Sequence, residues 1–397
     1  MLEKREMTNG TTSRKGLIVG IDASRNRSGG AVAHIKGILS GTDIQDHGIE
    51  KVYLWSHKNL LDQIPDYSWL EKVSTVQLDK SMIHQLWWQA VCLKNELSRF
   101  GCDILFTVGA STLCRFSPQV VLSQDMMSYE PGVMEYYGFG KTRLRLELIL
   151  QLQNLAFRRA EGVIFLTKYA GTVIQGACGR LKNVEYIPHG ISENFLLQQK
   201  EYLTSFSNES SISAVYVSQA DLYKHQWEVV KAIAQLRKKG INISLMLIGG
   251  GSGKAKQLLD TQIKESDPEC SFVRQVSFLP NDEIPERLVS SDIFIFASSC
   301  ENMPITLLEG MAVGLPIACS SRGPMPEVLG DAGVYFDPVD SNSISSAIEQ
   351  LVKNPVLMKN TAMKAKQVAS EYTWAKCAER TWSFIVKTYS GCCDNKA

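Results

Sequence analysis

Short runs of apolar and β-branched residues alternate with longer segments of helical periodicity along most of the chain. These runs predict strands at 17–21, 52–55, 104–108, 120–123, 162–166 and 184–187, and then at 214–218, 244–248, 276–279, 293–297, 316–319 and 333–336. Helical patterns lie between them, for example at 81–99, 141–160, 226–238 and 341–352. Strand–helix alternation is typical of parallel sheets covered by helices on both faces, so we predict an α/β protein with doubly wound sheets.

The alternation is interrupted at 196–211, where glutamine and serine are frequent and the apolar residues fit neither period. We interpret this segment as a linker between two domains of roughly 180 residues each, a usual domain size. We predict a first Rossmann-like domain at 1–200, a second at 201–372, and a terminal helix within 373–397 that packs back on the first. Ligands bind beyond the carboxyl ends of parallel strands, so the two domains are expected to face each other across a cleft.

The 397 residues include 42 basic and 41 acidic side chains, a net charge of +1. Nucleic-acid-binding proteins generally show a basic excess, so this balance argues against that class. No apolar run approaches the roughly eighteen residues of a membrane span, and the first sixteen residues lack the apolar stretch of a signal peptide. We expect a cytoplasmic protein. The ten cysteines contain no Cys-x-x-Cys pair, which disfavours a structural zinc site.

The most specific polar pattern follows the predicted strand at 293–297 and includes Glu301, Pro304 and Glu309. Proline suits the first turn of a helix, because its φ is already helical and its missing N–H needs no partner there. A helix from about Pro304 would direct free N–H groups at the cleft and form an anion site. Two carboxylates would then flank a space of diphosphate size. The alternative is an ordinary amphipathic helix with two solvated glutamates, which the spacing alone favours.

A second pattern follows the predicted strand at 214–218 and includes Gln219, Asp221 and Lys224. Asp221 is a good N-cap for the helix through residue 238, which would place Lys224 in its first turn. A cation is unfavourable at that end of the helix dipole, and an anionic ligand would remove the penalty. For an isolated lysine, however, a side chain that simply extends into water is the commoner case.

Gly29, Gly30 and His34 follow the first predicted strand and open a helix. Two glycines let the backbone approach a phosphate, although an ordinary loop pair is about as good an interpretation and the Gly-x-Gly-x-x-Gly pattern is absent. For His34 we favour a packed or capping role. The glycine-rich segment 249–254 fails the Walker A spacing, so we interpret it as a strand-to-helix turn.

These motifs together resemble glycosyltransferase family 4, a group of retaining enzymes of the GT-B fold, most strongly over 276–338. The Glu-x7-Glu signature corresponds to Glu301 and Glu309, and the segments at 310–316 and 322–328 are similar to those that follow it in the family. Residues 186–191 resemble the family's Pro-x-Gly hinge, and the segment from Trp374 resembles its terminal helix. The resemblance implies a nucleoside diphosphate sugar as co-substrate and retention of anomeric configuration by front-face substitution.

The resemblance also implies a donor site made of residues from both domains: Gly29, Gly30, Gln219, Lys224, Leu279, Glu301, Met303, Pro304, Ile305 and Glu309. Glu309 would hold the ribose hydroxyls, and Glu301 would contact the transferred sugar. Lys224 would neutralise the diphosphate. The base would lie near Leu279, read by backbone groups. No Asp-x-Asp motif occurs, so we expect no metal and no resident cofactor, and positive charge with helix N-termini would stabilise the leaving nucleotide.

Three departures from the family pattern affect the expected site. Gln219 stands where the family usually has an arginine, five residues before the lysine, so leaving-group stabilisation would be weaker or depend on another cation. Asp125 follows the strand at 120–123 in a loop where a histidine often lies near the sugar, and it is the nearest candidate for acceptor contact. Residues 302–304 replace the usual Gly-Phe-Gly with Asn-Met-Pro, which keeps the helix start. Glu301, Lys224 and Asp125 are the candidate catalytic residues.

The expected function is hexosyl transfer to an acceptor hydroxyl, in the biosynthesis of a surface polysaccharide or glycolipid. The acceptor would be a saccharide or a lipid-linked saccharide. Two alternatives stay open: a nucleotide-sugar epimerase of the same fold, and a non-catalytic scaffold that binds nucleotide sugars, which Gln219 favours.

The predicted helix at 141–160 carries Lys141, Arg143 and Arg145 near its start, with apolar residues beyond. These residues allow two interpretations. One is a peripheral contact with the inner face of a membrane that presents a lipid-linked acceptor. The other, which we favour, is the solvated basic end of a core helix.

Overall fold

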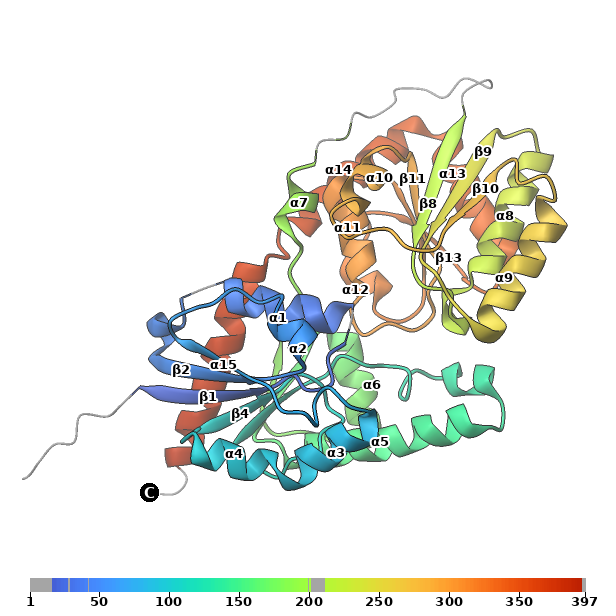
Figure 1. The fold of residues 1–397 in the computed structure, drawn as a ribbon. Coiled ribbons are helices and arrows are strands. Elements are labelled where there is room, and N and C mark those ends of the chain that lie inside the picture. Colours follow the sequence, from blue (N-terminus) through green and yellow to red (C-terminus); the bar gives the residue numbers. More distant parts are fainter. Residues whose placement is uncertain (1–15, 28, 42, 199, 201–210, 395–397) are drawn as a thin grey trace, which may run out of the picture.

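The computed structural model describes residues 16–27, 29–41, 43–198, 200 and 211–394. The chain forms two lobes, each a parallel sheet flanked by helices (Figure 1). This arrangement confirms the predicted α/β fold class with two doubly wound domains.

The first lobe contains seven parallel strands in the order β3-β2-β1-β4-β5-β6-β7. Their bounds are β1 (Leu17–Asp22), β2 (Ile49–Trp55), β3 (Leu70–Val73), β4 (Ile104–Thr107), β5 (Gln119–Leu122), β6 (Gly162–Phe165) and β7 (Val184–Tyr186). The central strands β4, β5 and β6 are buried at every position, because helices cover both faces of the sheet. The strand order reverses between β1 and β4, and such a reversal opens a crevice at the carboxyl ends of the two strands.

The second lobe contains six parallel strands in the order β10-β9-β8-β11-β12-β13. Their bounds are β8 (Ile212–Val217), β9 (Ile243–Ile248), β10 (Val273–Val276), β11 (Ile293–Phe296), β12 (Ile317–Ser320) and β13 (Val334–Phe336). Here the order reverses between β8 and β11, so these two strands mark the expected ligand crevice of the second domain.

Helices connect the strands and cover the two sheets. In the first domain they are α1 (Gly30–Ser40), η1 (Ile44–His47), α2 (Lys58–Leu61), α3 (Met82–Val91), α4 (Leu93–Arg99), η2 (Val133–Tyr137), α5 (Lys141–Arg159), α6 (Lys168–Cys178) and α7 (Glu193–Leu196). Those that follow are η3 (Leu222–Lys224), α8 (Gln226–Lys238), α9 (Gly253–Ser266), α10 (Ile284–Val289), α11 (Ile305–Val313), α12 (Met325–Leu329), α13 (Ser341–Lys353), α14 (Pro355–Ala369) and α15 (Trp374–Asp394).

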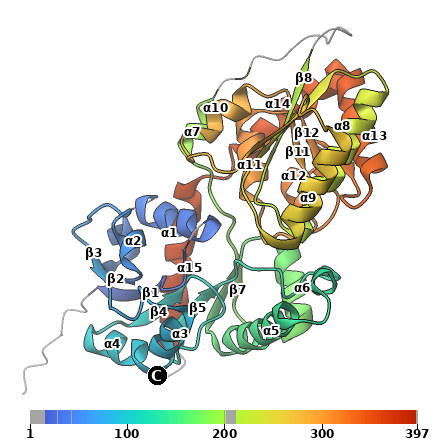
Figure 2. The ribbon, with the colours of Figure 1, turned by 45° about the vertical axis from the view of Figure 1, so that its right-hand side comes forward.

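The terminal helix α15 returns to the first domain and runs beside α1 (Figures 1 and 2). The indole nitrogen of Trp382 donates a hydrogen bond to the carbonyl of Ile38 at 3.1 Å. Gly37 of α1 faces the ring of Trp374, where an added Cβ would lie only 2.1 Å from the nearest ring atom. A glycine at this position therefore allows the two helices to approach closely.

Two segments of the described residues, 187–191 and 372–374, connect the lobes and contact each other. The N–H of Ile191 donates to the carbonyl of Tyr372 at 2.9 Å, and a Cβ on Gly190 would lie 2.2 Å from the nitrogen of Trp374. His34 of α1 is fully buried beside them, its Nδ1 3.1 Å from Nδ1 of His189. This burial confirms the packed role expected for His34. The predicted domain boundary lies between residues 200 and 201. Residues 199 and 201–210 are outside the described part of the chain.

Two local expectations were wrong, and one strand was missed. The strand expected at 276–279 lies at Val273–Val276, because the carboxylate of Asp267 accepts the backbone N–H groups of residues 271, 272 and 273 and fixes where the strand starts. The helix expected at 81–99 is split into α3 and α4 around Cys92. The short edge strand β3 was not predicted at all.

Candidate functional site

Lys224 and Glu301 meet at the point where the second sheet reverses direction. Lys224 ends the turn after β8, and Glu301 lies in the loop after β11. The ammonium of Lys224 and a carboxylate oxygen of Glu301 form an ion pair whose side chains are only 14% and 15% exposed. The structure therefore brings together two of the three candidate catalytic residues.

Lys224 does not lie in the first turn of an α-helix, as we had expected. Asp221 caps the 3-10 turn η3, its carboxylate accepting the N–H of the next residue at 2.7 Å. The helix α8 begins only at Gln226, since His225 has a left-handed φ of 47°. Burial lowers the pKa of His225 to about 4, so its ring is neutral at pH 7 and adds no positive charge beside Lys224.

Helix α11 starts one residue later than expected, at Ile305, with Pro304 as its N-cap. The carbonyl of Pro304 accepts the N–H groups of Leu307 and Leu308 at 3.1 and 3.2 Å. The first N–H groups of a helix have no partner within it, and here they lie only a few residues after Glu301. The N-terminus of α11 therefore follows Glu301 closely along the chain, and a helix end of this kind suits an anion.

Glu309, in the second turn of α11, carries a buried carboxyl. The residue is 9% exposed, and burial raises its pKa to about 8. Among the described residues no hydrogen bond or ion pair involves this carboxyl. Its hydrogen-bonding capacity is therefore available to a ligand.

The loop between Glu301 and α11 is held by the first domain. The side-chain amide of Asn302 donates to Ser123 Oγ at 3.1 Å, and the hydroxyl of Thr167 donates to the Asn302 carbonyl at 3.0 Å. The N–H of His189 contacts the sulfur of Met303 at 3.1 Å. Both domains consequently determine the position of this loop.

Gly29 and Gly30 place a second helix N-terminus beside α11. Gly30 is the first residue of α1, and a Cβ there would lie 2.8 Å from Cδ1 of Ile305. Gly29 has a φ of 64°, a conformation that favours glycine. The positive ends of two helix dipoles, one from each domain, therefore lie close together.

Gln219 and Leu279 lie in the connections after β8 and β10. Gln219 is exposed and lines a pocket of about 590 Å³ between residues 135–138 of the first domain and the loops after β8 and β9. Leu279 is half-buried against the core, in the loop after β10. Within the described part of the chain, no hydrogen bond links either residue to the Lys224–Glu301 pair.

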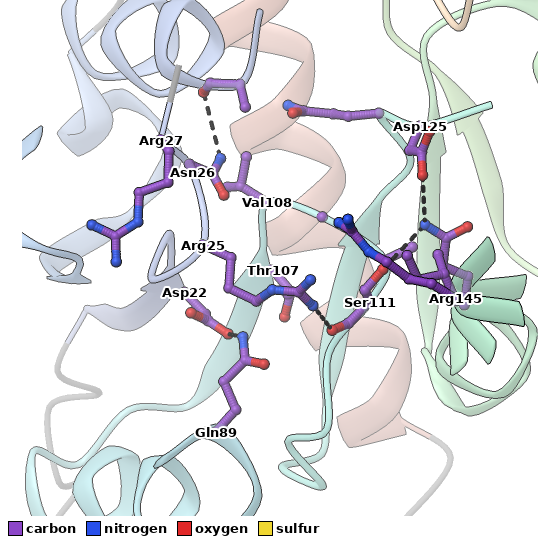
Figure 3. A pocket seen from close by; sticks show the side chains of 16 residues that line it. Asp22, Arg25, Asn26, Arg27, Gln89, Thr107, Val108, Ser111, Asp125 and Arg145 are labelled. Carbon is purple, nitrogen blue, oxygen red and sulfur yellow. Dashed lines mark hydrogen bonds between the residues drawn. The ribbon is translucent and has the colours of Figure 1, made fainter. Parts of the chain in front are cut away.

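Asp125 lies in a different pocket, of about 350 Å³, where the first sheet reverses between β1 and β4. Its Oδ1 accepts the N–H of Met127 at 3.0 Å, and its Oδ2 accepts the amide of Gln153 at 3.5 Å. Figure 3 shows Asp125 with Arg25 and Arg145 around one space. The third candidate catalytic residue is therefore not in direct contact with the other two.

The two sites are nonetheless neighbours. Asp125 follows Ser123 by two residues, and Asn302, which bonds to Ser123, directly follows Glu301. The hydrogen bond between Asn302 and Ser123 thus joins the loop that carries Asp125 to the loop that carries Glu301.

The sequence did not identify the other polar residues of this pocket, among them Asp22, Arg25, Gln89, Thr107 and Gln153. Asp22 and Thr107 end strands β1 and β4, which is a signal that a search for polar strand ends could have used. Gln89 and Gln153 come from helices α3 and α5, and tertiary packing alone brings them here.

The described residues contain neither a metal-binding cluster nor a membrane-spanning helix. Among them, no group of three or more His, Cys, Asp or Glu side chains is arranged to hold a metal ion. None of the helices in these residues combines the length and apolar character needed to cross a bilayer.

Residues 200–368, which span most of the second domain, match the family of glycosyl transferases group 1. Among curated proteins, the chain is 28% identical over 120 residues to the O-antigen chain mannosyltransferase B of Escherichia coli, a match that covers 30% of this chain and 32% of that protein. The chain thus matches only about a third of that relative's length.

Solved structures share the whole architecture. Sucrose-phosphate synthase from Thermosynechococcus elongatus superposes with a TM-score of 0.75 at 14% identity, covering 94% of this chain and all of that one. The Anabaena protein HepE in complex with UDP-glucose superposes with a TM-score of 0.67 at 19% identity, again over 94% and 100% of the two chains. At these identities the comparison establishes the GT-B fold.

Proposed function

We propose that the chain transfers a sugar from a nucleoside diphosphate sugar to an acceptor hydroxyl, as the match of residues 200–368 to the glycosyl transferases group 1 family supports. The observation that best supports the proposal is the Lys224–Glu301 ion pair at the strand-order reversal of the second sheet. The helix that follows Glu301, α11, adds a free N-terminus and the buried carboxyl of Glu309. A cation and a helix N-terminus suit a diphosphate, and carboxylates suit hydroxyl groups.

In the proposed complex, Lys224 exchanges its bond to Glu301 for one to the diphosphate. Glu301 is then free to accept hydrogen bonds from the transferred sugar, and Glu309 accepts them from the ribose hydroxyls. The backbone at 303–305 and the Gly29–Gly30 segment border the sugar and phosphates, while Gln219 and Leu279 lie toward the nucleotide end.

We propose retention of configuration without a metal ion. The bond between the sugar anomeric carbon and the diphosphate oxygen breaks, and the acceptor oxygen bonds to the same face of that carbon. The acceptor proton passes to the leaving phosphate oxygen. Lys224 and the two helix N-termini stabilise the negative charge that develops on the diphosphate.

The acceptor would occupy the pocket beyond β1 and β4, with Asp125 in its wall. The hydrogen bond between Ser123 and Asn302 supports this placement, because it holds the pocket next to the loop that follows Glu301. We propose a saccharide or lipid-linked saccharide acceptor, in the biosynthesis of a surface polysaccharide or glycolipid.

We further propose that α5 contacts an anionic membrane surface. Leu144 and Leu148 lie one turn apart on this helix and are more than half exposed, and Phe139 before it is 98% exposed with Arg143 stacked on its ring. Exposed apolar side chains beside basic ones suit a lipid interface.

The membrane contact is tested by sedimentation with vesicles that contain anionic lipid. We expect the wild type to sediment with them, and L144S/L148S to reduce the bound fraction. L258S, in the second domain, should leave the bound fraction unchanged. Equal sedimentation of all three, or none above buffer, would contradict this contact.

The transfer reaction is tested by incubating the chain with UDP-, GDP- and ADP-sugars and a panel of saccharide acceptors, with and without EDTA. The proposal expects release of nucleoside diphosphate that depends on acceptor, resists EDTA and yields a product whose anomeric proton in NMR shows retained configuration. Conversion of donor without acceptor would instead indicate an epimerase. Binding of donor with no turnover across the panel would indicate a scaffold.

A further inference from the structure

The pocket beyond β1 and β4 contains a concentration of buried polar atoms without partners. Gln89, Thr107 and Gln153 line it and are each at most 3% exposed. Their Oε1, Oγ1 and Oε1 atoms have no hydrogen-bond partner among the described residues. Nε2 of Gln124, which also lines the pocket, is a fourth such atom. An unpaired buried polar group costs about 1–3 kcal/mol, so four around one cavity suit a polar ligand, or water that such a ligand displaces.

The free atoms of the two glutamines are acceptors. The amide nitrogen of Gln89 donates to Oδ2 of Asp22 at 2.7 Å, and a carboxylate only accepts, so its oxygen is the free atom. The amide nitrogen of Gln153 donates to Ser111 Oγ at 3.1 Å and points toward Asp125, which leaves its oxygen free in the same way. A ligand that satisfies these atoms brings several hydrogen-bond donors together with an acceptor for Gln124, and the hydroxyl groups of a saccharide provide both.

Two guanidinium groups face the same space. Arg25 extends from the loop after β1 and donates to the Ser111 carbonyl at 2.6 Å, and Arg145 extends toward it from α5 (Figure 3). In the described part of the chain, neither arginine has a carboxylate within ion-pair distance. Burial, together with the charge of Arg145, lowers the pKa of Arg25.

The carboxylates in the pocket wall offset this positive charge only in part. Asp22 is buried and already accepts hydrogen bonds from Gln89 and from the N–H of Ser24, and burial raises its pKa. Asp125 accepts the N–H of Met127. An anion placed between the two arginines would relieve the repulsion between them and gain charge-assisted hydrogen bonds.

We propose that the acceptor is a saccharide unit bearing an anionic group, a phosphate or a carboxylate, which Arg25 and Arg145 bind while Gln89, Thr107 and Gln153 accept bonds from its hydroxyls. The pocket's volume of about 350 Å³ suits one sugar unit rather than a long chain. This inference rests on the proposed transfer function, since it names the class of acceptor.

The test measures binding by calorimetry and needs no turnover. The probes are glucose 1-phosphate, glucuronic acid and neutral methyl glucoside, together with a glucosyl diphosphate on a short prenyl chain. Each is titrated into the wild type, R145Q and R159Q, the last being an exposed arginine at the far end of the same helix. Repeating the titrations with K224M separates this pocket from the donor site.

At least one anionic probe is expected to bind more tightly than methyl glucoside. R145Q should weaken that probe roughly ten- to hundredfold, R159Q and K224M should not, and salt should reduce the difference. Tight binding of the soluble probes indicates a sugar acid or sugar phosphate acceptor, and tight binding of the prenyl probe alone indicates a lipid diphosphate.

Equal affinity for neutral and anionic probes, no binding of any anionic probe, or equal affinities in R145Q and R159Q would overturn the inference. Failure of this inference can be distinguished from failure of the transfer proposal. Arg145-dependent binding of an anionic probe without turnover of any donor would contradict only the transfer proposal. Turnover with neutral acceptors that R145Q leaves unchanged would contradict only the inference of an anionic acceptor.

Discussion

Burial of the Glu309 carboxyl lowers the stability of the folded chain at higher pH, but it leaves the carboxyl available to a ligand. Its pKa rises from 4.5 to about 8 because its carboxyl is buried, so between those values the folded chain holds a proton that the unfolded chain has lost. The stability that this residue contributes is therefore complete below about pH 4.5 and is lost as pH rises through 8. A carboxyl kept at this cost for stability is typical of a binding site.

The first prediction concerns E309Q. Because glutamine has no charge to bury, the free energy of unfolding of E309Q at pH 8 should exceed that of the wild type by on the order of 2–4 kcal/mol. At pH 5 the two free energies should differ little. Chemical denaturation at the two pH values measures this, with E265Q, an exposed site on α9, as the control. A loss of stability at pH 8 in E309Q would show that the carboxyl is paired in the folded protein.

The sequence identified some site residues and missed others for a physical reason. Lys224 and Glu301 lie in the connections after β8 and β11, which neighbour each other in the sheet, so position along the chain was a guide to position in space. Gln89 and Arg145 reach their pocket from separate helices, and no local pattern records that packing.

At the scale of elements, close contact between α1 and α15 attaches the terminal helix to the first domain. Gly37 allows that contact, since a Cβ would meet the ring of Trp374 at 2.1 Å. Gly176 in α6 is also a helical glycine, but a Cβ there would meet nothing within 4 Å. The two positions thus form a matched pair.

We predict that G37A lowers the free energy of unfolding by about 1–3 kcal/mol through overpacking. G176A should raise it by about 0.5–1 kcal/mol, because alanine favours the helix and nothing obstructs it. Thermal and denaturant unfolding of both variants check this. A stable G37A would mean that α15 is not packed on α1 as described.

The predicted bounds of helices and strands agreed with the structure where burial of apolar residues determines them. They differed where the hydrogen bonds of a particular side chain determine where an element starts. The pattern correctly located α8, whose aliphatic residues Val229, Ile233 and Leu236 are buried in the core. It misplaced β10, because the hydrogen bonds of Asp267 rather than the apolar residues set the start of that strand. Helix starts at Gln226 and Ile305 likewise depend on backbone conformations just before them.

At the scale of the whole molecule, the proposed donor site depends on both domains. Asn302 and Met303 are held by Ser123, Thr167 and His189 of the first domain, and Gly30 contacts Ile305. The paired crossings at 187–191 and 372–374 adjoin this contact, so a rotation about them would alter the donor loop directly. Such an arrangement suits closure over a bound donor.

The most direct test of the account is calorimetric titration of the wild type, K224M and K239M with UDP, GDP and ADP. Lys239 is an exposed lysine at the end of α8 that pairs with Glu349, so it controls for loss of a charge elsewhere in the domain. One of the three nucleotides should bind the wild type and K239M equally, and K224M roughly ten- to hundredfold more weakly. Equal binding to K224M, or binding of none of the three nucleotides to the wild type, would contradict a diphosphate site at the Lys224–Glu301 pair.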